Sequence, residues 1–234
     1  MNESFKKVAI VQSNYIPWRG YFDLIASVDE FIFLDDVQFT KRDWRNRNQI
    51  RTSTGPKWLT VPVKTKGKFF QKICETKISN QEWQNLHWAL IEKNYYKANY
   101  FEEVSVFLKP VYTDQNWTSL SQLNRALIEK VLNYLKVDTK LSWSWEYNCT
   151  GSKSEKLLNI VKSSNANIYV SGPAAKCYLD IKLFQKSGLE VKWFDYDNLK
   201  SYPQIGEDFI SKISIIDLIM NVGKKSIEFL PNAQ

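Results

Sequence analysis

His87 is the only histidine in the 234-residue chain, and its ordinary pKa near neutrality makes it the natural candidate for a general base. Two adjacent carboxylates, Asp35 and Asp36, end the apolar run EFIFL and are candidates to orient such a base or to hold a substrate amine. Successive side chains of a strand point to opposite faces, so only one of the two can face a given cleft. The alternatives are a hydrogen-bonded core histidine and a carboxylate that caps the following loop.

Residues 42–48 read RDWRNRN and concentrate three guanidinium groups, two amides and an indole. Guanidinium forks match phosphate and carboxylate oxygens, while an aromatic face with amide donors suits a sugar or nucleotide ring. A solvated basic loop is the alternative for any single arginine. We expect this segment to bind a phosphorylated small molecule through Arg42, Trp44, Arg45, Asn46, Arg47 and Asn48.

The positive charge of the chain is concentrated in residues 41–77. This window holds eleven Lys and Arg against two acidic residues, a local charge of +9 in a chain whose total is +7. Such a basic surface usually meets an acidic partner. The partners that such a patch would meet are a nucleotide, a lipid phosphate or another phosphorylated small molecule, an acidic acyl-carrier protein, or nucleic acid. Nucleic acid is not expected, because no RNP-type, zinc-finger or helix-turn-helix pattern is present.

Cysteine and histidine usage and hydropathy exclude further classes of protein. Three widely separated cysteines and one histidine give no metal-ligand spacing, so we expect neither a metal nor a cofactor. The N-terminus leads into a strand-like run rather than a signal peptide, and no apolar run approaches the roughly 20 residues of a membrane span. We expect a cytoplasmic protein in which residues 1–234 form a single domain.

Apolar periodicity predicts the elements that position these side chains. Strand-like runs cover residues 8–12 and 30–36, and ligands of open α/β sheets contact the polar residues that follow such strands. A helix from residue 80 points His87 inward, residues 119–135 form the clearest helix, and residues 57–63 read as a third strand. The binding residues expected around the first two strand ends are Gln12, Asn14, Tyr15, Tyr21 and Gln38.

A β-α-β unit is expected in the last third of the chain. Ser152-x-x-Glu155 is a capping box that starts a helix, the run NIYVSG is a strand, and a helix to Gly188 precedes the strand LEVKWFDY. Free N–H groups at the start of that second helix would hold a phosphate, with a plain β-α turn as the alternative. Ser171, Gly172 and Tyr178 are the binding residues expected here.

The order of these elements predicts an α/β fold. Its sheet is mostly parallel, Rossmann-like and flanked by helices, because strands alternate with helical patterns at both ends of the chain. The helical stretch at residues 80–135 is expected to form a sub-lobe beside this sheet.

Several long segments resemble the WbqC-like family of bacterial surface-polysaccharide gene clusters. They are VQSNYIPWRGYFDLI, FIFLDDVQFTKRDWRNRN, the His87 helix with KANYF after it, YVSGPAAKCYLD and SIIDLIMNVG. Two departures from the family pattern, Ser13 and the Ala-Lys that follows Ala174, change no titratable group of the family's motifs. The resemblance implies a protein of O-antigen or lipopolysaccharide synthesis, and suggests transfer of an acyl or aminoacyl group onto the amine of a nucleotide-linked sugar.

A second resemblance, to nucleotidylyltransferases of the HIGH type, covers the opening strand, loop and helix and the position of Ser171-Gly172. The signature histidines of those enzymes are absent, so the resemblance implies their fold rather than adenylyl transfer. The alternatives to acyl transfer are therefore a glycosyltransferase or nucleotidyltransferase-like enzyme on the same sugars, and a non-catalytic subunit that binds a carrier protein.

Overall fold

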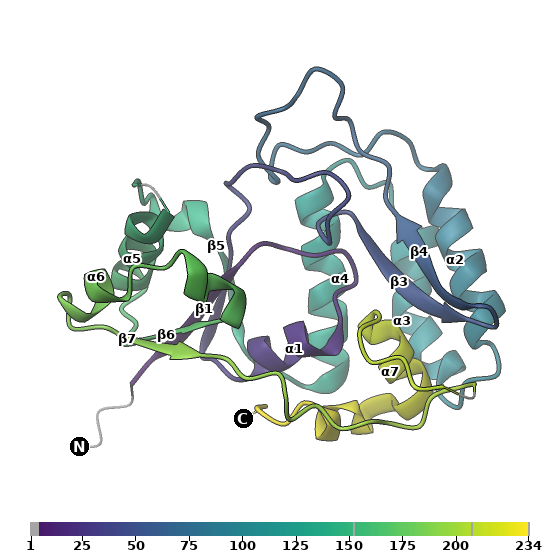
Figure 1. Ribbon diagram of the computed structural model, residues 1–234. Coiled ribbons are helices and arrows are strands. Elements are labelled where there is room, and N and C mark those ends of the chain that lie inside the picture. Colours follow the sequence, from purple (N-terminus) through teal and green to yellow (C-terminus); the bar gives the residue numbers. More distant parts are fainter. Residues whose placement is uncertain (1–4, 152, 207, 234) are drawn as a thin grey trace.

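The computed structural model describes residues 5–151, 153–206 and 208–233, and its centre is a five-stranded parallel sheet (Figure 1). This arrangement confirms the predicted α/β class. Counted within this sheet alone, the spatial order of the strands is 3-2-1-4-5, the doubly wound order of Rossmann folds. The order is β5 (Lys140–Trp143), β2 (Glu30–Phe33), β1 (Lys7–Val11), β6 (Ile168–Ser171) and β7 (Glu190–Trp193).

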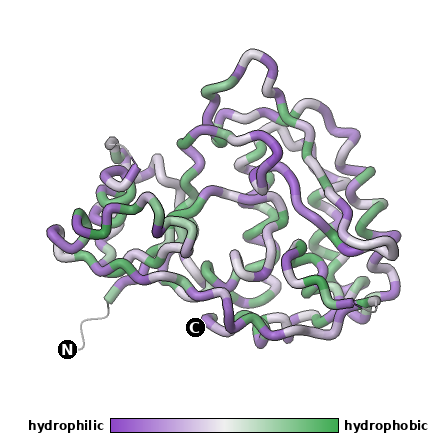
Figure 2. The backbone as a smooth tube through the Cα atoms, viewed as in Figure 1, coloured by the Kyte–Doolittle hydropathy of each residue, from purple (hydrophilic) through white to green (hydrophobic). Residues whose placement is uncertain are grey.

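Helices cover both faces of this sheet, which explains why its central strands are apolar on both sides. Ala9 of β1 belongs to the core cluster shared with α1 (Arg19–Ala26), α4 (Leu120–Leu135) and α7 (Ile215–Val222). Its neighbours Val8 and Ile10 belong to the opposite core cluster. Hydrophobic segments accordingly run along the central strands (Figure 2). The second cluster is shared with α5 (Lys153–Ser163) and α6 (Ile181–Gln185).

Beside the sheet lies a group of elements made of α2 (Glu82–Tyr95), α3 (Phe101–Thr113) and a two-stranded antiparallel sheet (Figure 1). That small sheet is the hairpin of β3 (Arg47–Thr52) and β4 (Gly55–Thr60). The helices of residues 80–135 share one hydrophobic core cluster with the parallel sheet. Three 3-10 segments complete the elements: η1 (Ser144–Tyr147), η2 (Pro173–Cys177) and η3 (Gly223–Phe229).

Three details differ from the sequence predictions. The strand predicted at residues 57–63 is present as β4 but ends at Thr60, and it pairs with β3, a strand that the sequence did not predict and that begins inside the arginine-rich segment. The helix expected before Gly188 is two short pieces, η2 and α6. On α2, Leu86 is 64% exposed although it lies at helical spacing from the buried Trp83. Ser152, expected to cap α5, lies outside the described residues.

Within the described ranges, no helix combines the length and the apolar sequence that crossing a membrane would need. In the same residues, no three His, Cys, Asp or Glu side chains come together as metal ligands would.

Candidate functional site

Two adjoining cavities lie over the carboxyl ends of the parallel strands. The chain leaves β1 through α1 toward β2 on one side, whereas α5 brings it back to β6 on the other side of β1. The topological switch point is therefore between β1 and β6, where open α/β sheets bind their ligands. Tyr196, which follows β7, lines both cavities.

The edge cavity, of about 530 Å³, lies over the ends of β1 and β6, and the aromatic cavity, of about 520 Å³, lies beside it. Each has the size of a small-molecule site, typically ~300–1,000 Å³. The polar and aromatic lining of the edge cavity is Gln12, Arg45, Tyr169, Ser171, Gly172, Tyr178 and Tyr196. The aromatic cavity is lined by Asn14, Pro17, Trp18, Arg19, Trp44, Asn48, Tyr196, Asp197, Leu199, Ser211 and Lys212.

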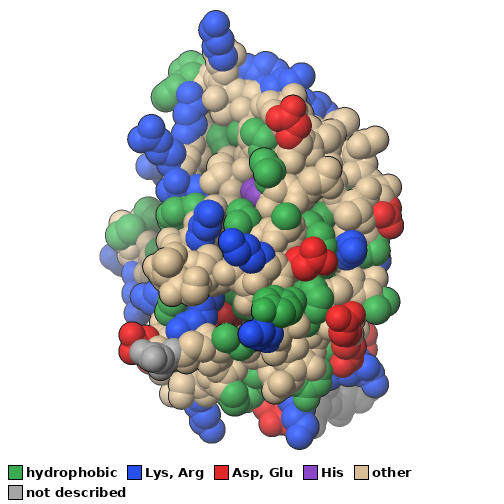
Figure 3. Space-filling model, turned by 90° about the vertical axis from the view of Figure 1, so that its right-hand side faces the viewer, with side chains coloured by type: hydrophobic (Ala, Val, Ile, Leu, Met, Phe, Trp, Pro, Cys, Tyr) green, Lys and Arg blue, Asp and Glu red, His purple; other side chains and the backbone are tan. Residues whose placement is uncertain are grey.

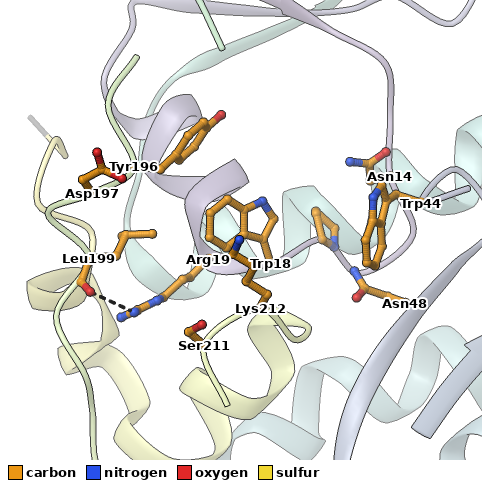
Figure 4. Close-up of a pocket in the computed structure, with 11 residues that line it drawn as sticks. Asn14, Trp18, Arg19, Trp44, Asn48, Tyr196, Asp197, Leu199, Ser211 and Lys212 are labelled. Carbon is orange, nitrogen blue, oxygen red and sulfur yellow. Dashed lines mark hydrogen bonds between the residues drawn. The ribbon is translucent and has the colours of Figure 1, made fainter. Parts of the chain in front are cut away.

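Trp18 lines the aromatic cavity and lies between Tyr196 on one side and Trp44 on the other (Figure 4). The rings of Trp18 and Tyr196 lie 5.2 Å apart by their centroids, and Trp44 is 42% exposed. Gly20 permits this position of Trp18, because a Cβ built on Gly20 would lie 2.4 Å from a carbon of the indole ring. Aromatic faces of this kind are suited to stack on a planar ring or on the apolar face of a sugar.

Charged groups of both signs surround these rings. Arg19, at the first position of α1, donates to the carbonyl of Leu199 at 3.3 Å and to that of Lys200 (Figure 4). Burial lowers the pKa of Arg19. Lys212 adds a second cation, and Asp197 is the carboxylate that lines the cavity. The aromatic cavity can therefore hold a polar ring that carries both an anionic and a cationic group.

Arg45 lines the edge cavity beside the strand end of β1. Its guanidinium donates to Asn14 Oδ1 at 2.5 Å and to the carbonyl of Gln12 at 3.4 Å, and it lies 3.6 Å from a carboxylate oxygen of Asp43. Its side chain is 12% exposed, and its Nε has no partner among the described residues. An arginine held in this way is suited to receive a phosphate or carboxylate.

Asp35 holds the loop between β1 and α1 in place through buried hydrogen bonds. Its carboxylate accepts hydrogen bonds from the backbone N–H and the hydroxyl of Ser13, both at 2.7 Å, and from the hydroxyl of Ser121. Asn124 donates to the Ser13 hydroxyl at 3.0 Å and to the carbonyl of Arg45 at 2.9 Å. Burial raises the pKa of the Asp35 carboxyl, while these hydrogen bonds and Arg45 lower it. Asp35 is fully buried and therefore positions the site rather than touching a ligand.

His87 is bonded to a tyrosine and not to a carboxylate. Its Nδ1 lies 2.8 Å from the hydroxyl of Tyr15, which in turn lies 3.0 Å from that of Tyr112. The imidazole is 5% exposed and packs against Trp83, and burial lowers its pKa to about 4. Only a small part of it is visible, in a hollow on one face of the molecule (Figure 3). The expectation that Asp35 or Asp36 orients His87 is wrong, because both carboxylates bond elsewhere.

The other residues expected near the second strand end are bonded to neighbouring segments rather than lining the two cavities. Asp36 binds Lys156 of α5 and accepts a hydrogen bond from the Ser144 hydroxyl at 2.5 Å. Gln38 donates to the carbonyl of Phe69 at 3.0 Å. Neither Asp36 nor Gln38 lines the edge or aromatic cavity.

The arginine-rich segment divides between the cavities and the hairpin. Arg47 is the first residue of β3, stacks over the ring of Trp58 at 4.1 Å and donates to the carbonyl of Arg42 at 2.7 Å. The side chain of Arg42 is exposed, and neither arginine lines the cavities. Asn46 donates to the carbonyl of Val61 at 2.8 Å, a bond that joins the segment to the end of β4. The structure thus brings Trp44, Arg45 and Asn48 to the cavities and uses the remainder to hold the hairpin.

Three further candidates are committed to the backbone around the site. Asn48 donates to the carbonyl of Ile16 at 2.8 Å and lines the aromatic cavity only in part, since it is 2% exposed. Tyr21 donates to the carbonyl of Gln12 at 3.0 Å. Tyr15 is fully buried in its pair with His87.

A helix N-terminus does not form at Ser171-Gly172, contrary to the sequence expectation. Pro173 begins η2 and has no N–H, and the N–H of Ala175 bonds to the carbonyl of Gly172 at 3.1 Å. Ser171, Gly172 and the half-exposed Tyr178 nevertheless line the edge cavity. They contribute shape and polar side chains rather than an array of free backbone donors.

Sequence reasoning missed the cavity residues that follow β7 and those before α7. Tyr196 and Asp197 lie three and four residues after the end of β7, so the strand-end rule that selected Gln12 and Asn14 would have selected them too. Trp18 and Arg19 also line the aromatic cavity but were not among the binding residues expected from the sequence. Lys212 lies in a segment without regular structure, and no sequence pattern marks it.

Comparisons with known proteins give one family and one relative of undefined activity. The family model described as WbqC-like protein family matches residues 12–229. A protein of Mycobacterium tuberculosis (strain ATCC 25618 / H37Rv) described as "Uncharacterized protein Rv1507c" is 50% identical over 225 residues, which cover 96% of this chain and 97% of that protein. No solved structure shows a significant match.

Proposed function

The chain belongs to the WbqC-like protein family, and from this premise we propose a cytoplasmic transferase that moves an acyl or aminoacyl group onto the amine of a nucleotide-linked amino sugar. The observation that carries the proposal is the pair of adjoining cavities at the switch point of the sheet, with Arg45 beside them. The polysaccharide context, including O-antigen and lipopolysaccharide, rests on the family resemblance.

A nucleotide-linked sugar has the parts that these cavities accommodate. Its phosphates face the guanidinium of Arg45, which lines the edge cavity and is oriented by its hydrogen bond to Asn14. One of its ring systems stacks on Trp18 and Trp44 in the aromatic cavity. The second ring system occupies the edge cavity, which shares the Tyr196 wall.

The transfer step requires one proton acceptor in the cavities. The sugar amine attacks the acyl carbon, a C–N bond forms, the bond to the donor's leaving group breaks, and the amine loses a proton. Asp197 lines the aromatic cavity and is the residue assigned here to hold the amine and receive that proton. His87 is not assigned this role, because it lines neither cavity and burial lowers its pKa to about 4.

A non-catalytic subunit that binds a sugar nucleotide or a carrier protein is the second candidate. The observation that favours it is the position of His87, since the only imidazole of the chain is 5% exposed and bonded to Tyr15. Such a subunit would need the cavities and Arg45 but no proton acceptor in them.

Ligand-induced thermal shifts with a panel of nucleotide sugars and the matching free nucleotides test the proposal. A ligand at 100 times its Kd adds about 2.7 kcal/mol of stability, which raises the Tm of a protein of this size by roughly 5–10 °C. Arg45→Gln should weaken binding by about tenfold or more. The matched variant Arg42→Gln, an exposed arginine of the same segment that lines neither cavity, should bind as the parent does.

Mass spectrometry of the bound sugar then separates the two candidates. With a suitable acyl donor, the parent should add the mass of the acyl group, and Asp197→Asn should bind equally well but turn over at least ~100-fold more slowly. Binding without transfer for any donor class would favour the non-catalytic subunit. An absence of binding for every nucleotide sugar in the panel would refute the proposed function itself.

A further inference from the structure

Residues 64–72, read as KTKGKFFQK, form a loop that projects from the body of the molecule (Figure 1, top). We call it the projecting loop. Phe69 and Phe70 are 71% and 82% exposed, the largest exposures among the aromatic side chains described. Lys64, Lys66, Lys68 and Lys72 are exposed as well, and the loop contains no acidic residue.

The projecting loop is held in place at its base. The N–H of Phe39 bonds to the carbonyl of Gln71 at 2.9 Å, and the side chain of Gln71 donates to the carbonyl of Lys64 at 2.9 Å. The N–H of Lys64 bonds to the carbonyl of Lys77 at 2.8 Å. These bonds present the tip as a defined structure, in which the rings of Phe69 and Phe70 meet edge to face with centroids 5.0 Å apart.

Among the described residues, neither kind of side chain at the tip packs into the core or forms an ion pair. The two phenyl rings pack mainly on one another, and neither belongs to the core clusters. In the part of the chain that the structure describes, no lysine of the projecting loop forms an ion pair. Figure 3 shows blue Lys and Arg side chains gathered with green hydrophobic ones at the top of the molecule.

We propose that the projecting loop docks the protein on an anionic lipid surface, with Phe69 and Phe70 entering the headgroup region and the four lysines meeting lipid phosphates. A convex apolar tip ringed by cations suits a fluid, planar, negatively charged surface, which needs no complementary pocket. A protein partner would have to supply a concave apolar site that matches both rings. The charge of the loop, four cations and no anion, selects an anionic surface over a neutral one.

Docking would also orient the candidate site. The N–H of Cys74 bonds to the carbonyl of Asp35 at 2.8 Å and that of Ile73 to the carbonyl of Val37 at 3.0 Å, so the base of the loop is tied to the segment that follows β2. That segment leaves the same edge of the parallel sheet on which the two cavities open. The inference stands on the loop alone and does not depend on the proposed transferase activity.

Co-sedimentation with vesicles tests the proposal. The purified full chain should pellet with vesicles of phosphatidylcholine containing 30% phosphatidylglycerol, stay in solution with pure phosphatidylcholine, and be released by 0.5 M NaCl. Phe69→Ser/Phe70→Ser should lower the partition coefficient by about tenfold per ring. Lys66→Gln/Lys68→Gln should lower it by about 30-fold, since each lysine near such a surface contributes roughly a factor of five.

Two control variants remove the same groups elsewhere. Phe5→Ser deletes a phenylalanine that is 60% exposed, and Lys182→Gln/Lys186→Gln removes two exposed charges from and beside α6. Both should bind anionic vesicles as the parent does. Equal losses in the control and loop variants would overturn the assignment to the loop, as would no binding to anionic vesicles at all.

The same variants distinguish lipid binding from two other interactions of the tip, self-association and binding to a protein partner. A parent chain that is dimeric by analytical ultracentrifugation without lipid, and that Phe69→Ser/Phe70→Ser converts to a monomer, would replace the proposal by self-association. Loop-dependent binding of a purified acidic acyl-carrier protein, without binding to anionic vesicles, would replace it by protein docking.

Discussion

Acidification from pH 7.5 to pH 5 should cost the protein about 2 kcal/mol of unfolding free energy through His87 alone. Burial lowers the pKa of this side chain from 6.5 to about 4, and in the unfolded chain the pKa returns to its ordinary value. Below pH 6.5 the unfolded state therefore binds a proton that the native state does not. The loss of stability begins near pH 6.5, grows as the pH falls, and levels off at roughly 3 kcal/mol below about pH 4.

Urea unfolding followed by tryptophan fluorescence measures this effect in the parent and in His87→Asn, whose amide can still meet the Tyr15 hydroxyl. The expected result is that the parent loses about 2 kcal/mol more than the variant between the two pH values. Asp35 and Asp217, whose pKa values are raised by burial, titrate in both proteins and cancel in this comparison. Because the chain has one histidine, a single imidazole NMR signal reports the same pKa directly.

A pKa near 6.5 in the NMR titration, with equal pH dependence of stability in both proteins, would refute this reasoning. It would mean that water reaches the imidazole, and His87 would return as a candidate base.

Further substitutions test how the site is held. Gly20→Ala should move the Trp18 ring, because a carbon of that ring lies 2.4 Å from the new Cβ. Ligand binding measured by calorimetry should weaken about tenfold, while the free energy of unfolding changes by roughly 1 kcal/mol or less. Unchanged affinity would exclude the Trp18 ring from ligand binding. Asp35→Ala leaves three buried hydrogen-bond donors without an acceptor and should lower the free energy of unfolding in urea by about 3–5 kcal/mol. The side chain of Asp36 is 17% exposed, so Asp36→Ala should lower it by only about 1 kcal/mol. Similar costs for both would contradict the positioning role. Tyr15→Phe removes one hydroxyl from two hydrogen bonds and should cost about 1–2 kcal/mol, with no effect on calorimetric affinity if the imidazole lies outside the site.

The fold class could be predicted from the sequence because its signals are local. The apolar runs of β1, β2 and β6 are nearly continuous, as buried parallel strands require, and the stripe of α4 keeps its helical period over sixteen residues. The pairing of strands was harder to predict from the sequence. β3 reads RNQIRT, a polar run whose strand state comes from its partner β4 rather than from its own propensity.

The site could be predicted in part, because some of its residues are marked by local sequence signals and others are not. The strand-end rule and the arginine-rich segment led to Gln12, Asn14 and Arg45, which the structure places at the two cavities. The direction of a side chain at a strand end depends on the pleat and on the turn that follows. Although Asp35 and Asp36 are adjacent in sequence, Asp35 bonds in the buried cluster around Ser13, whereas Asp36 bonds to Lys156 of α5.

The pairing of β1 with β6 has a consequence for how the protein is made. Lys6 and Asn167, which are hydrogen-bonded beside these strands, are 161 residues apart in sequence. At ribosomal rates of about 5–20 residues per second, β6 follows β1 out of the ribosome by roughly 10–30 s. During this interval one hydrogen-bonding edge of an apolar strand has no native neighbour, and such edges recruit other chains. The nascent chain is therefore most prone to aggregate before its last third is synthesised, and a chaperone that covers the β1 edge would act in that interval.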